Sequence, residues 1–179
     1  MNENARLFDC LPYQLQRFPK ADMFGAKENG EWRTYSTAEV QETVNRLSAG
    51  LLQLGVSGND MTVENQDKIA LISRNRPEWM MLDLACQQIG AALCPIYPTT
   101  NINELEFIFN DAAVKYVFVS GQDILDKVSF IRDRVKSLLN VYSFDDLPGA
   151  DSWKQLLDSA TPESLEKVEQ VKAGILPEH

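Results

Sequence analysis

The sequence is short of histidine, cysteine and positive charge, and each shortage argues against a class of function. Its 179 residues contain 17 Lys and Arg against 26 Asp and Glu, which gives a formal net charge of -9 at pH 7. Long-range repulsion from that charge opposes an encounter with a nucleic-acid backbone or an anionic membrane surface. We therefore expect no nucleic-acid partner.

Cysteine and histidine are too few and too scattered for the sites that they usually build. Cys10, Cys86 and Cys94 are odd in number and show no C-x-x-C spacing, which argues against a disulfide framework and against a zinc site. We expect them to be reduced thiols buried in a core. The one histidine, His179, is the last residue, so a His-based triad or metal site would depend on a chain end. We expect no metal site.

No apolar run is long enough to cross a membrane. The longest tract, residues 79–96, contains Asp83, Gln87, Gln88 and Pro95, which interrupt an apolar helix. The first ten residues, MNENARLFDC, lack the basic, apolar and small-residue order of a secretory signal. These features predict a cytoplasmic protein without a transmembrane span.

The first third of the chain predicts a β-hairpin followed by a helix. An Asn29-Gly30 pair divides residues 24–35, and Asn-Gly between two strand-like runs is the strongest short-range hairpin signal. Residues 36–39, STAE, then match the capping box that opens a helix, and Gly55 is the residue type that usually ends one. Apolar residues recur between them at helical spacing and predict a buried face: Val40, Val44, Leu47, Leu51 and Leu54.

After a polar loop at residues 57–67, short apolar runs alternate with longer amphipathic ones. This alternation is typical of βαβ units in a parallel sheet, and the low charge of the strands fits a sheet covered on both faces. The sequence therefore predicts an α/β fold: a doubly wound, mostly parallel sheet with flanking helices, preceded by the small β-hairpin and helix. The expected strands are residues 69–73, 92–97, 115–120 and 141–144, and the expected helices are 77–89, 102–112, 122–138, 152–159 and one that begins at Thr161-Pro162.

The motifs that usually cradle phosphates do not occur. The nine glycines are scattered, and neither G-x-x-x-x-G-K-[ST] nor G-x-G-x-x-G is present. Asp145 and Asp146 precede a Pro-Gly turn, where solvated carboxylates are commoner than a metal-binding pair. Residues 99–101, TTN, could place hydroxyls around a ligand, but capping of the next helix, with Glu104 in its first turn, explains the same residues.

The stretch SRNRPEW, residues 73–79, is the stronger candidate for an anion-binding site, because ligands bind at the carboxyl ends of strands in open α/β sheets. Pro77 fits the first position of a helix, the residue before it is pushed out of the α region, and Glu78 suits the positive end of a helix. We expect Arg74 and Arg76 to pair with a carboxylate such as Glu78. This prediction favours a structural role over an anion-binding one.

Three segments carry a resemblance to a known family. WRTYSTAEV at residues 32–40, SRNRPEW at 73–79 and QIGAALCPIYPT at 88–99 resemble motifs of the AMP-forming acyl-CoA synthetases. That superfamily also holds luciferases and peptide-synthetase adenylation domains. The order P-x-Y-P-T at 95–99 followed by ELEFIFNDA at 104–112 is similar to the long-chain fatty acyl-CoA ligase branch. The likeness covers most of the chain.

The resemblance implies an enzyme that converts ATP and a fatty acid to an acyl-adenylate and then passes the acyl group to coenzyme A. ATP, Mg2+ and coenzyme A are the cofactors that it implies for the full-length enzyme. The family's Ser/Thr/Gly-rich phosphate loop, its Thr-Glu pair for magnesium, its ribose-binding aspartate and its mobile C-terminal lysine have no counterpart in this sequence. We therefore assign no catalytic, cofactor-binding or metal-binding residue, and expect none of these cofactors to bind to this chain alone.

By the same resemblance, VKAGILPEH at residues 171–179 leads toward that phosphate loop. Residues 1–179 are then expected to be the N-terminal α/β subdomain of an AMP-binding enzyme, inactive alone. Its expected parts are a hairpin plus helix at 1–55, a βαβ core at 68–145 and a helical connection at 151–179.

The partners that the resemblance implies are the rest of the enzyme and the fatty acid. Peripheral membrane contact and self-association of the fragment stay open. Two other functions also stay open. One is a stand-alone α/β interaction module derived from this subdomain, and the other is an aryl or amino-acid adenylating enzyme.

Overall fold

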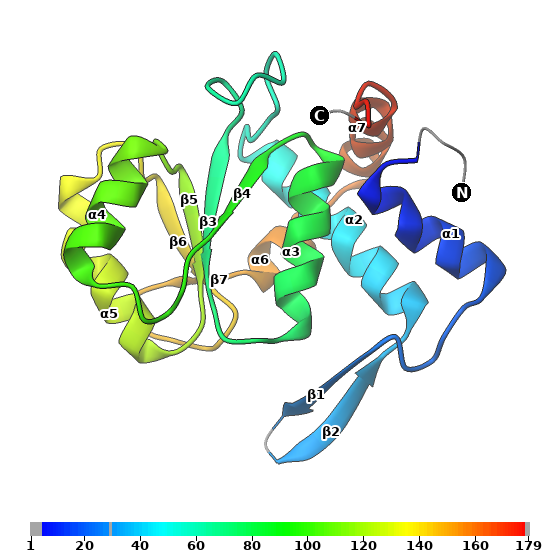
Figure 1. Cartoon of the computed structure of the whole chain (residues 1–179). Coiled ribbons are helices and arrows are strands. Elements are labelled where there is room, and N and C mark those ends of the chain that lie inside the picture. The colour runs from blue at the N-terminus through cyan, green and yellow to red at the C-terminus, as the bar shows by residue number, and fades with distance from the viewer. Residues whose placement is uncertain (1–4, 29, 178–179) are drawn as a thin grey trace. The chain divides into compact units, whose positions relative to one another are not determined.

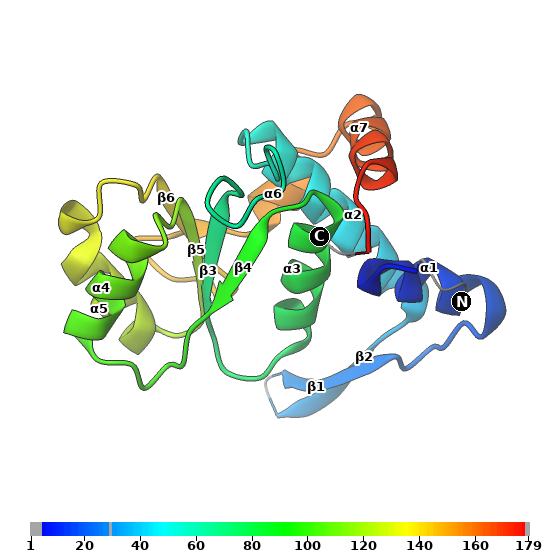
Figure 2. The ribbon, with the colours of Figure 1, turned by 45° about the horizontal axis from the view of Figure 1, so that its top comes forward.

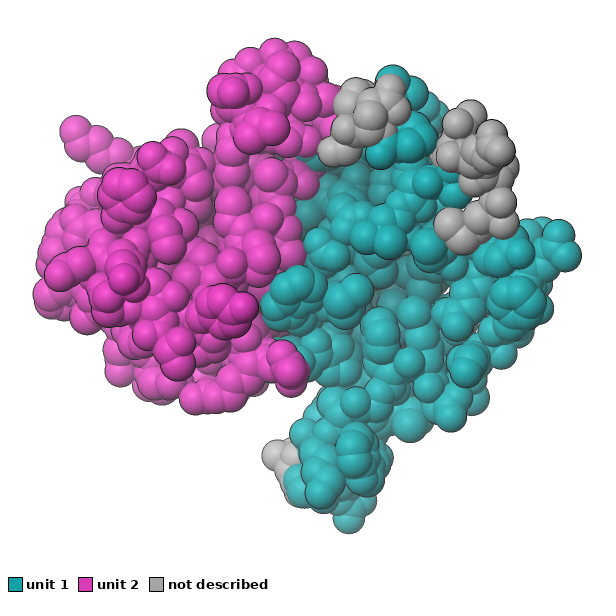
Figure 3. Space-filling model, viewed as in Figure 1, with its two compact units in different colours: residues 1–56, 76–90, 156–179 teal, residues 57–75, 91–155 magenta. Residues whose placement is uncertain are grey.

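The computed structural model describes residues 5–28 and 30–177, so Asn29 of the expected turn and His179 lie outside the described residues. The chain divides into two compact units, which Figure 3 distinguishes by colour. Unit 1 consists of residues 1–56, 76–90 and 156–179, and unit 2 of residues 57–75 and 91–155. Each unit is therefore assembled from stretches that are separated in the sequence.

Unit 1 is a group of helices with one β-hairpin. The hairpin and the helix after it confirm the expectation from the Asn-Gly pair and the capping box, and α2 contacts α1, α3 and α7 (Figure 1). The elements of unit 1 are η1 (Leu7–Asp9), α1 (Cys10–Arg17), β1 (Phe24–Glu28), β2 (Glu31–Tyr35), α2 (Thr37–Gln53), α3 (Pro77–Gln88), most of α6 (Lys154–Asp158) and α7 (Pro162–Ala173).

The start and end of α2 follow from local chemistry. The Ser36 hydroxyl accepts a hydrogen bond from the Glu39 N–H at 3.2 Å, and the Glu39 carboxylate accepts one from the Ser36 N–H at 2.7 Å. Both satisfy backbone donors that a helix N-terminus leaves unpaired. Gly55, with a φ of +79°, turns the chain out of the helix. Of the expected apolar face, Leu54 is half-buried, and the other four are buried: Val40, Val44, Leu47 and Leu51.

Gly50 allows the chain at Leu156 to approach α2 closely. A Cβ atom at Gly50 would lie 2.9 Å from both the carbonyl carbon and the Cα of Leu156, and closer still to its carbonyl oxygen. Two side chains of α2 hold the same segment, because Arg46 donates to the carbonyl of Leu157 and Gln53 to that of Ser159, each at 2.9 Å. Residues 156–159 therefore pack directly on α2.

Unit 2 is a five-stranded parallel sheet with two helices on one face. Figures 1 and 2 show α4 and α5 side by side on that face. The strand order is β4-β3-β5-β6-β7, and every neighbouring pair is parallel. The elements are β3 (Lys68–Ile72), β4 (Ala92–Pro95), α4 (Ile102–Asp111), β5 (Tyr116–Val119), α5 (Gln122–Ile131), η2 (Arg132–Arg134), β6 (Asn140–Ser143) and β7 (Asp151–Ser152). The expected α/β fold with a parallel sheet, flanking helices and a preceding hairpin is confirmed.

One apolar cluster joins the two helices of unit 2 to the sheet. Residues of β3, β5 and β6 point into it, and within β3 and β5 they alternate, as the period of two in a strand requires. Its buried members are Ala70, Ile72, Leu105, Phe109, Val114, Val117, Val119, Ile124, Leu125, Val128, Ile131, Val135, Leu138 and Val141.

The residues between them in the strands point to the opposite face of the sheet, where aromatic rings form a row. Phe118 stacks on Tyr142 with ring centroids 5.2 Å apart, and Phe144 meets Trp153 edge to face at 5.5 Å. Burial raises the pKa of the Tyr142 hydroxyl above its ordinary value.

The expected helix at residues 122–138 is wrong in its extent, because α5 ends at Ile131. A 17-residue helix spans about 26 Å, whereas a four-residue strand spans about 13 Å, so the chain must turn back to begin β6 beside β5. It does so through η2, after which Val135 is extended, with φ -109° and ψ 93°. Val135 and Leu138 are still buried in the core, so the turn keeps the contacts that the helical spacing predicted.

Two further elements were not expected. Residues 141–144 were predicted to contain the last strand, but β7 follows and pairs with β6 through Tyr142–Asp151 and Ser143–Ser152. β7 has two polar residues and no apolar run, so only its pairing identifies it. The helix α1 contains Pro12, which discourages a helix in general but is tolerated in a first turn.

Among residues 5–28 and 30–177, none of the helices is both long enough and apolar enough to span a membrane.

Candidate functional site

The candidate site is the carboxyl edge of the sheet in unit 2, where loops follow the ends of β3, β5 and β6. We call the residues that interact there the carboxyl-edge cluster: Ser73, Arg74, Ser120, Gly121, Asp123 and Asp145. Parallel strands end at the same edge, and this is where ligands bind in open α/β sheets. The cluster therefore tests whether SRNRPEW contributes to an anion site.

Arg74 is held by the loop after β5. Its backbone N–H donates to the Ser120 hydroxyl at 3.2 Å, and its Nη2 pairs with Oδ2 of Asp123 at 3.1 Å. The two paired side chains are 65% and 60% exposed, so the pair is worth no more than about 1 kcal/mol. The expected structural pairing of Arg74 is confirmed, but its partner is Asp123 instead of Glu78, because the folded sheet brings the start of α5 beside the end of β3.

Asp145 closes the turn that starts α5. Its Oδ2 accepts a hydrogen bond from the Gly121 N–H at 2.8 Å, and its own N–H donates to the Ser143 hydroxyl at 3.0 Å. Gly121 has a φ of +83°, a conformation that side chains rarely adopt. Asp146 is exposed as expected, whereas Asp145 is half-buried, with its carboxylate turned to the Gly121 N–H at the start of α5.

The residues between β4 and α4 cap a helix, as predicted. The Asn101 side chain accepts a hydrogen bond from the Glu104 N–H at 3.0 Å. Lys127 of α5 donates to the carbonyl oxygens of Pro98 at 2.8 Å and Thr100 at 3.1 Å. The sequence analysis did not identify Lys127 as a contact residue, since its partners are backbone oxygens and no sequence motif predicts such contacts. Its ammonium group is thus occupied by backbone instead of facing a ligand.

Arg76 belongs to unit 1 and forms the pair that the sequence predicted. Its Nε lies 2.9 Å from Oε2 of Glu78 and its Nη2 lies 3.1 Å from Oε1, so the guanidinium grips the carboxylate with two bonds. Arg76 is extended, with φ -159° and ψ 157°, and Pro77 takes the first position of α3. Because Glu78 is buried, this pair is a structural element of the helix start.

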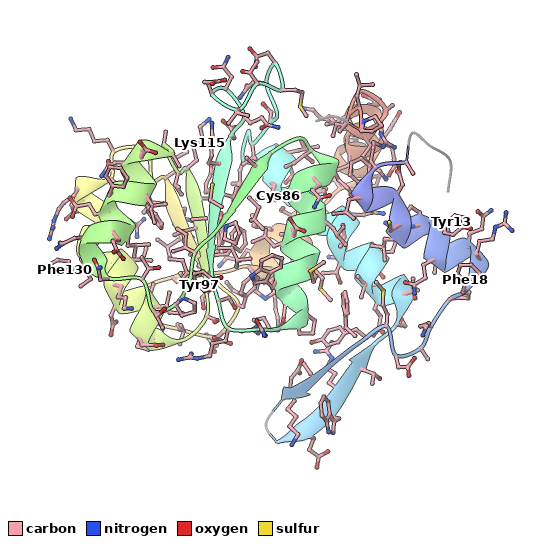
Figure 4. The ribbon with its side chains drawn as sticks, in the orientation of Figure 1. Tyr13, Phe18, Cys86, Tyr97, Lys115 and Phe130 are labelled. Atoms are coloured by element: carbon pink, nitrogen blue, oxygen red, sulfur yellow. The ribbon has the colours of Figure 1, made fainter. Side chains whose placement is uncertain are left out.

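Asp67 anchors the polar loop that the sequence predicted at residues 57–67. The loop is confirmed, but Asp67 itself is buried, and its carboxylate accepts from the Ser57 N–H at 3.0 Å and pairs with Lys115 at 2.6 Å. Lys115 is labelled in Figure 4. The sequence contains one signal for this anchor, which is an acidic residue directly before a buried strand. These two interactions of Asp67 hold the loop against the amino edge of the sheet.

The expectation that all three cysteines are buried is wrong. Cys86 on α3, labelled in Figure 4, is buried, Cys94 in β4 is half-buried and Cys10 at the start of α1 is exposed. Burial raises the pKa of the Cys94 thiol. Among the residues of α1, Leu11 is the buried one, so its neighbour Cys10 lies on the solvent side. None of the three described cysteines forms a disulfide bond.

The carboxyl-edge cluster does not fit the phosphates of ATP. The Gly121 N–H, which a phosphate would need, already donates to Asp145, and the carboxylates of Asp123 and Asp145 would repel a phosphate at the start of α5. Arg74 is partly neutralised by Asp123. Among the described residues, no group of three or more His, Cys, Asp or Glu is placed to hold a metal ion. The polar groups of this edge therefore pair with one another in this structure.

Comparison with known proteins matches the family of AMP-binding enzymes over residues 11–174. Long chain acyl-CoA synthetase 4 of Arabidopsis thaliana is 26% identical over 144 residues, which cover 76% of this chain and 20% of that protein. A solved structure from Rhodopseudomonas palustris, described as a long-chain-fatty-acid CoA ligase, has a TM-score of 0.70 and 25% identity, over 89% of this chain and 37% of that one.

A shorter relative is also similar. An uncharacterized protein of Mycobacterium tuberculosis is 31% identical over 104 residues, which cover 58% of this chain and 52% of that protein. By contrast, this chain spans about a fifth of the length of the long-chain acyl-CoA synthetases that it matches.

Proposed function

The chain belongs to the AMP-binding enzyme family, and we propose that it is the N-terminal part of a long-chain fatty acid-CoA ligase. The single observation that carries the proposal is its similarity over 76% of its residues to a long-chain acyl-CoA synthetase, of which it spans 20%. The solved ligase with a TM-score of 0.70 supports the same assignment, because the fold agrees over nearly the whole chain.

The proposed reaction of the full-length enzyme has two steps. A fatty acid carboxylate attacks the α-phosphate of ATP, which yields an acyl-adenylate and pyrophosphate, and the thiol of coenzyme A then displaces AMP to give acyl-CoA. ATP, Mg2+ and coenzyme A would be the cofactors, and we propose a cytoplasmic location.

This chain contributes scaffold in that proposal. The arginines of SRNRPEW brace the starts of two helices, Arg74 through Asp123 and Arg76 through Glu78, and the carboxyl-edge cluster does not fit a triphosphate. We therefore propose that the 179 residues alone do not form acyl-adenylate. The rest of the enzyme would supply the groups that bind ATP and would be the main partner of this chain.

A stand-alone interaction module is the second candidate. The short relative from Mycobacterium tuberculosis favours it, since this chain matches about half of that protein's length. The coding sequence after His179 separates the two candidates: a stop codon there favours the module, and a continuing frame with a Ser/Thr/Gly-rich loop that contains lysine favours the ligase.

The test of the ligase is a substrate panel on the longest polypeptide that the gene encodes. Acyl-CoA formation is measured with ATP, Mg2+ and coenzyme A against palmitate, benzoate and a mixture of amino acids. The proposal predicts the highest kcat/KM for palmitate. A preference for benzoate or for an amino acid would overturn the long-chain assignment in favour of an aryl or amino-acid adenylating enzyme.

A further inference from the structure

The strand β4 ends the sheet of unit 2 and is paired along one of its two edges. Among the described residues, β4 pairs with β3 alone. Ala92 and Ile96 donate their N–H groups to carbonyl oxygens on the β3 side, each at 2.9 Å. Because the backbone groups of successive strand residues point to opposite edges, those of Leu93 and Pro95 point away from β3. The second edge of β4 is therefore free to receive another strand.

The side chains of β4 are less covered than the residues of β3 that lie in register with them. Leu93 is in register with Ile69, and Cys94 with Ala70. Ile69 and Ala70 are completely buried, whereas Leu93 and Cys94 are half-buried. Successive residues of a strand point to opposite faces of the sheet, so both faces are incompletely covered at β4. An apolar strand beside β4 would cover the side chains on both faces.

The free edge of β4 is too short and too poor in donors to hold a separate molecule. Proline has no N–H, so the four-residue strand offers one donor, from Leu93, and two acceptors, from Leu93 and Pro95. Proline on an edge strand also discourages pairing with other molecules. So few hydrogen bonds do not offset the entropy that a separate molecule loses on association. A second copy would in addition meet the repulsion of a net charge of -9.

A segment of the same polypeptide does not meet this obstacle. The covalent connection keeps such a segment close, at an effective concentration on the order of millimolar, so a few hydrogen bonds and some apolar burial are enough to hold it. The half-buried side chains of β4 supply that apolar burial. The free edge therefore fits an extended apolar segment of its own chain.

We propose that the free edge of β4 pairs with a strand from the rest of the AMP-binding enzyme, through the N–H and C=O of Leu93 and the C=O of Pro95. The chain spans about a fifth of the length of the long-chain acyl-CoA synthetases that it matches, so an enzyme of that length has further chain to supply the strand. The inference rests on the proposed function, because the partner is part of the same enzyme. It locates one contact between this chain and that partner.

Amide hydrogen exchange, resolved at single residues by mass spectrometry, tests the pairing in the 179-residue chain and in the longest polypeptide that its gene encodes. The Leu93 amide should exchange at least ~100-fold more slowly in the longer polypeptide, because it gains an acceptor there. The Cys94 amide, which points to β3, is the internal control and should exchange slowly in both. Equally fast exchange of the Leu93 amide in both, or a gene that encodes no longer polypeptide, would overturn the proposal.

The rate of alkylation of Cys94 tests the same contact through a side chain. Cys94 should be alkylated at least ~10-fold more slowly in the longer polypeptide, since the added strand limits access to it. In that polypeptide Leu93→Pro removes the outward N–H but leaves the bonds to β3, and should restore the rate of the 179-residue chain. Leu93→Ala is the matched control, because it keeps the N–H and should stay slow. Equal rates in the two variants would refute pairing through the Leu93 N–H.

These measurements are separate from the substrate panel that tests the proposed function. Slow exchange of the Leu93 amide in a polypeptide that prefers benzoate would refute the long-chain assignment and support the pairing. Fast exchange in a polypeptide that prefers palmitate would support the assignment and refute the pairing.

Discussion

Alanine in place of Gly50 is expected to destabilise the protein, although alanine is the better helix former. Gly50 lies in the interior of α2, and a Cβ atom there would lie 2.9 Å from the carbonyl carbon and the Cα of Leu156, and closer to its oxygen. These are backbone atoms, so no side-chain rotation can relieve the overlap. The segment 156–159 would have to move away from α2 and would lose the hydrogen bonds from Arg46 and Gln53.

The expected loss in the free energy of unfolding is the difference between two opposing effects. Alanine is favoured over glycine by about 1 kcal/mol in a helix interior. Overpacking of a buried site costs about 1–3 kcal/mol, and the upper part of that range applies because the obstruction is backbone. The net loss in the free energy of unfolding is therefore about 2 kcal/mol.

Urea unfolding followed by far-UV circular dichroism measures this loss. Gly25→Ala is the matched control, since a Cβ atom there would meet the Trp32 ring at 3.8 Å, an ordinary van der Waals distance. The control should change stability little or raise it slightly. A Gly50→Ala variant as stable as the wild-type chain would show that Leu156 does not pack against α2, and the reasoning would be refuted.

Three further predictions concern the charged groups. Arg76→Ala should lower the free energy of unfolding by about 2 kcal/mol, because it leaves the buried Glu78 carboxylate unpaired. Arg74→Ala removes an exposed pair and should lower it by no more than about 1 kcal/mol. Equal losses for the two variants in urea unfolding would contradict the difference in burial. Asp67→Ala should speed amide hydrogen exchange within residues 57–67, since it removes the acceptor that ties the loop to the sheet, and unchanged exchange would argue against that anchor. A side-chain hydrogen bond from Arg6 holds the pKa of Asp9 below its usual 3.8, so the stability that Asp9 adds is present above about pH 4 and is lost as pH falls through the lowered pKa. The stabilities of the wild-type chain and Asp9→Asn should accordingly converge in acid, and a gap that widens below pH 4 would reverse the sign.

Local signals in the sequence predicted those parts of the fold that local chemistry determines. The capping box at Ser36 and Glu39 and the positive φ of Gly55 set the ends of α2, and each depends only on residues within one turn. The extended Arg76 before Pro77 is a similar case. The alternation of apolar and amphipathic runs was enough to predict the parallel sheet, because strands and crossover helices have different periods.

Contacts between distant residues could not be read from local patterns. The partner of Arg74 is Asp123, which lies 49 positions along the chain and becomes a neighbour only when β5 pairs with β3. The end of α5 at Ile131 depends on the length of the strands beside it, although the apolar spacing continues to Leu138. The candidate site shows the same limit, since the hydrogen bond from Gly121 to Asp145 joins two loops that only the sheet brings together.

The central claim is that the chain is the N-terminal part of a long-chain fatty acid-CoA ligase and supplies scaffold without forming acyl-adenylate itself. The most direct measurement is palmitate-dependent exchange of labelled pyrophosphate into ATP, made side by side on the 179-residue chain and on the longest polypeptide that its gene encodes. Our account predicts exchange by the longer polypeptide and none above background by the chain alone. Palmitate-dependent exchange by the 179 residues would contradict it, and so would a longer polypeptide that exchanges pyrophosphate only with benzoate or an amino acid.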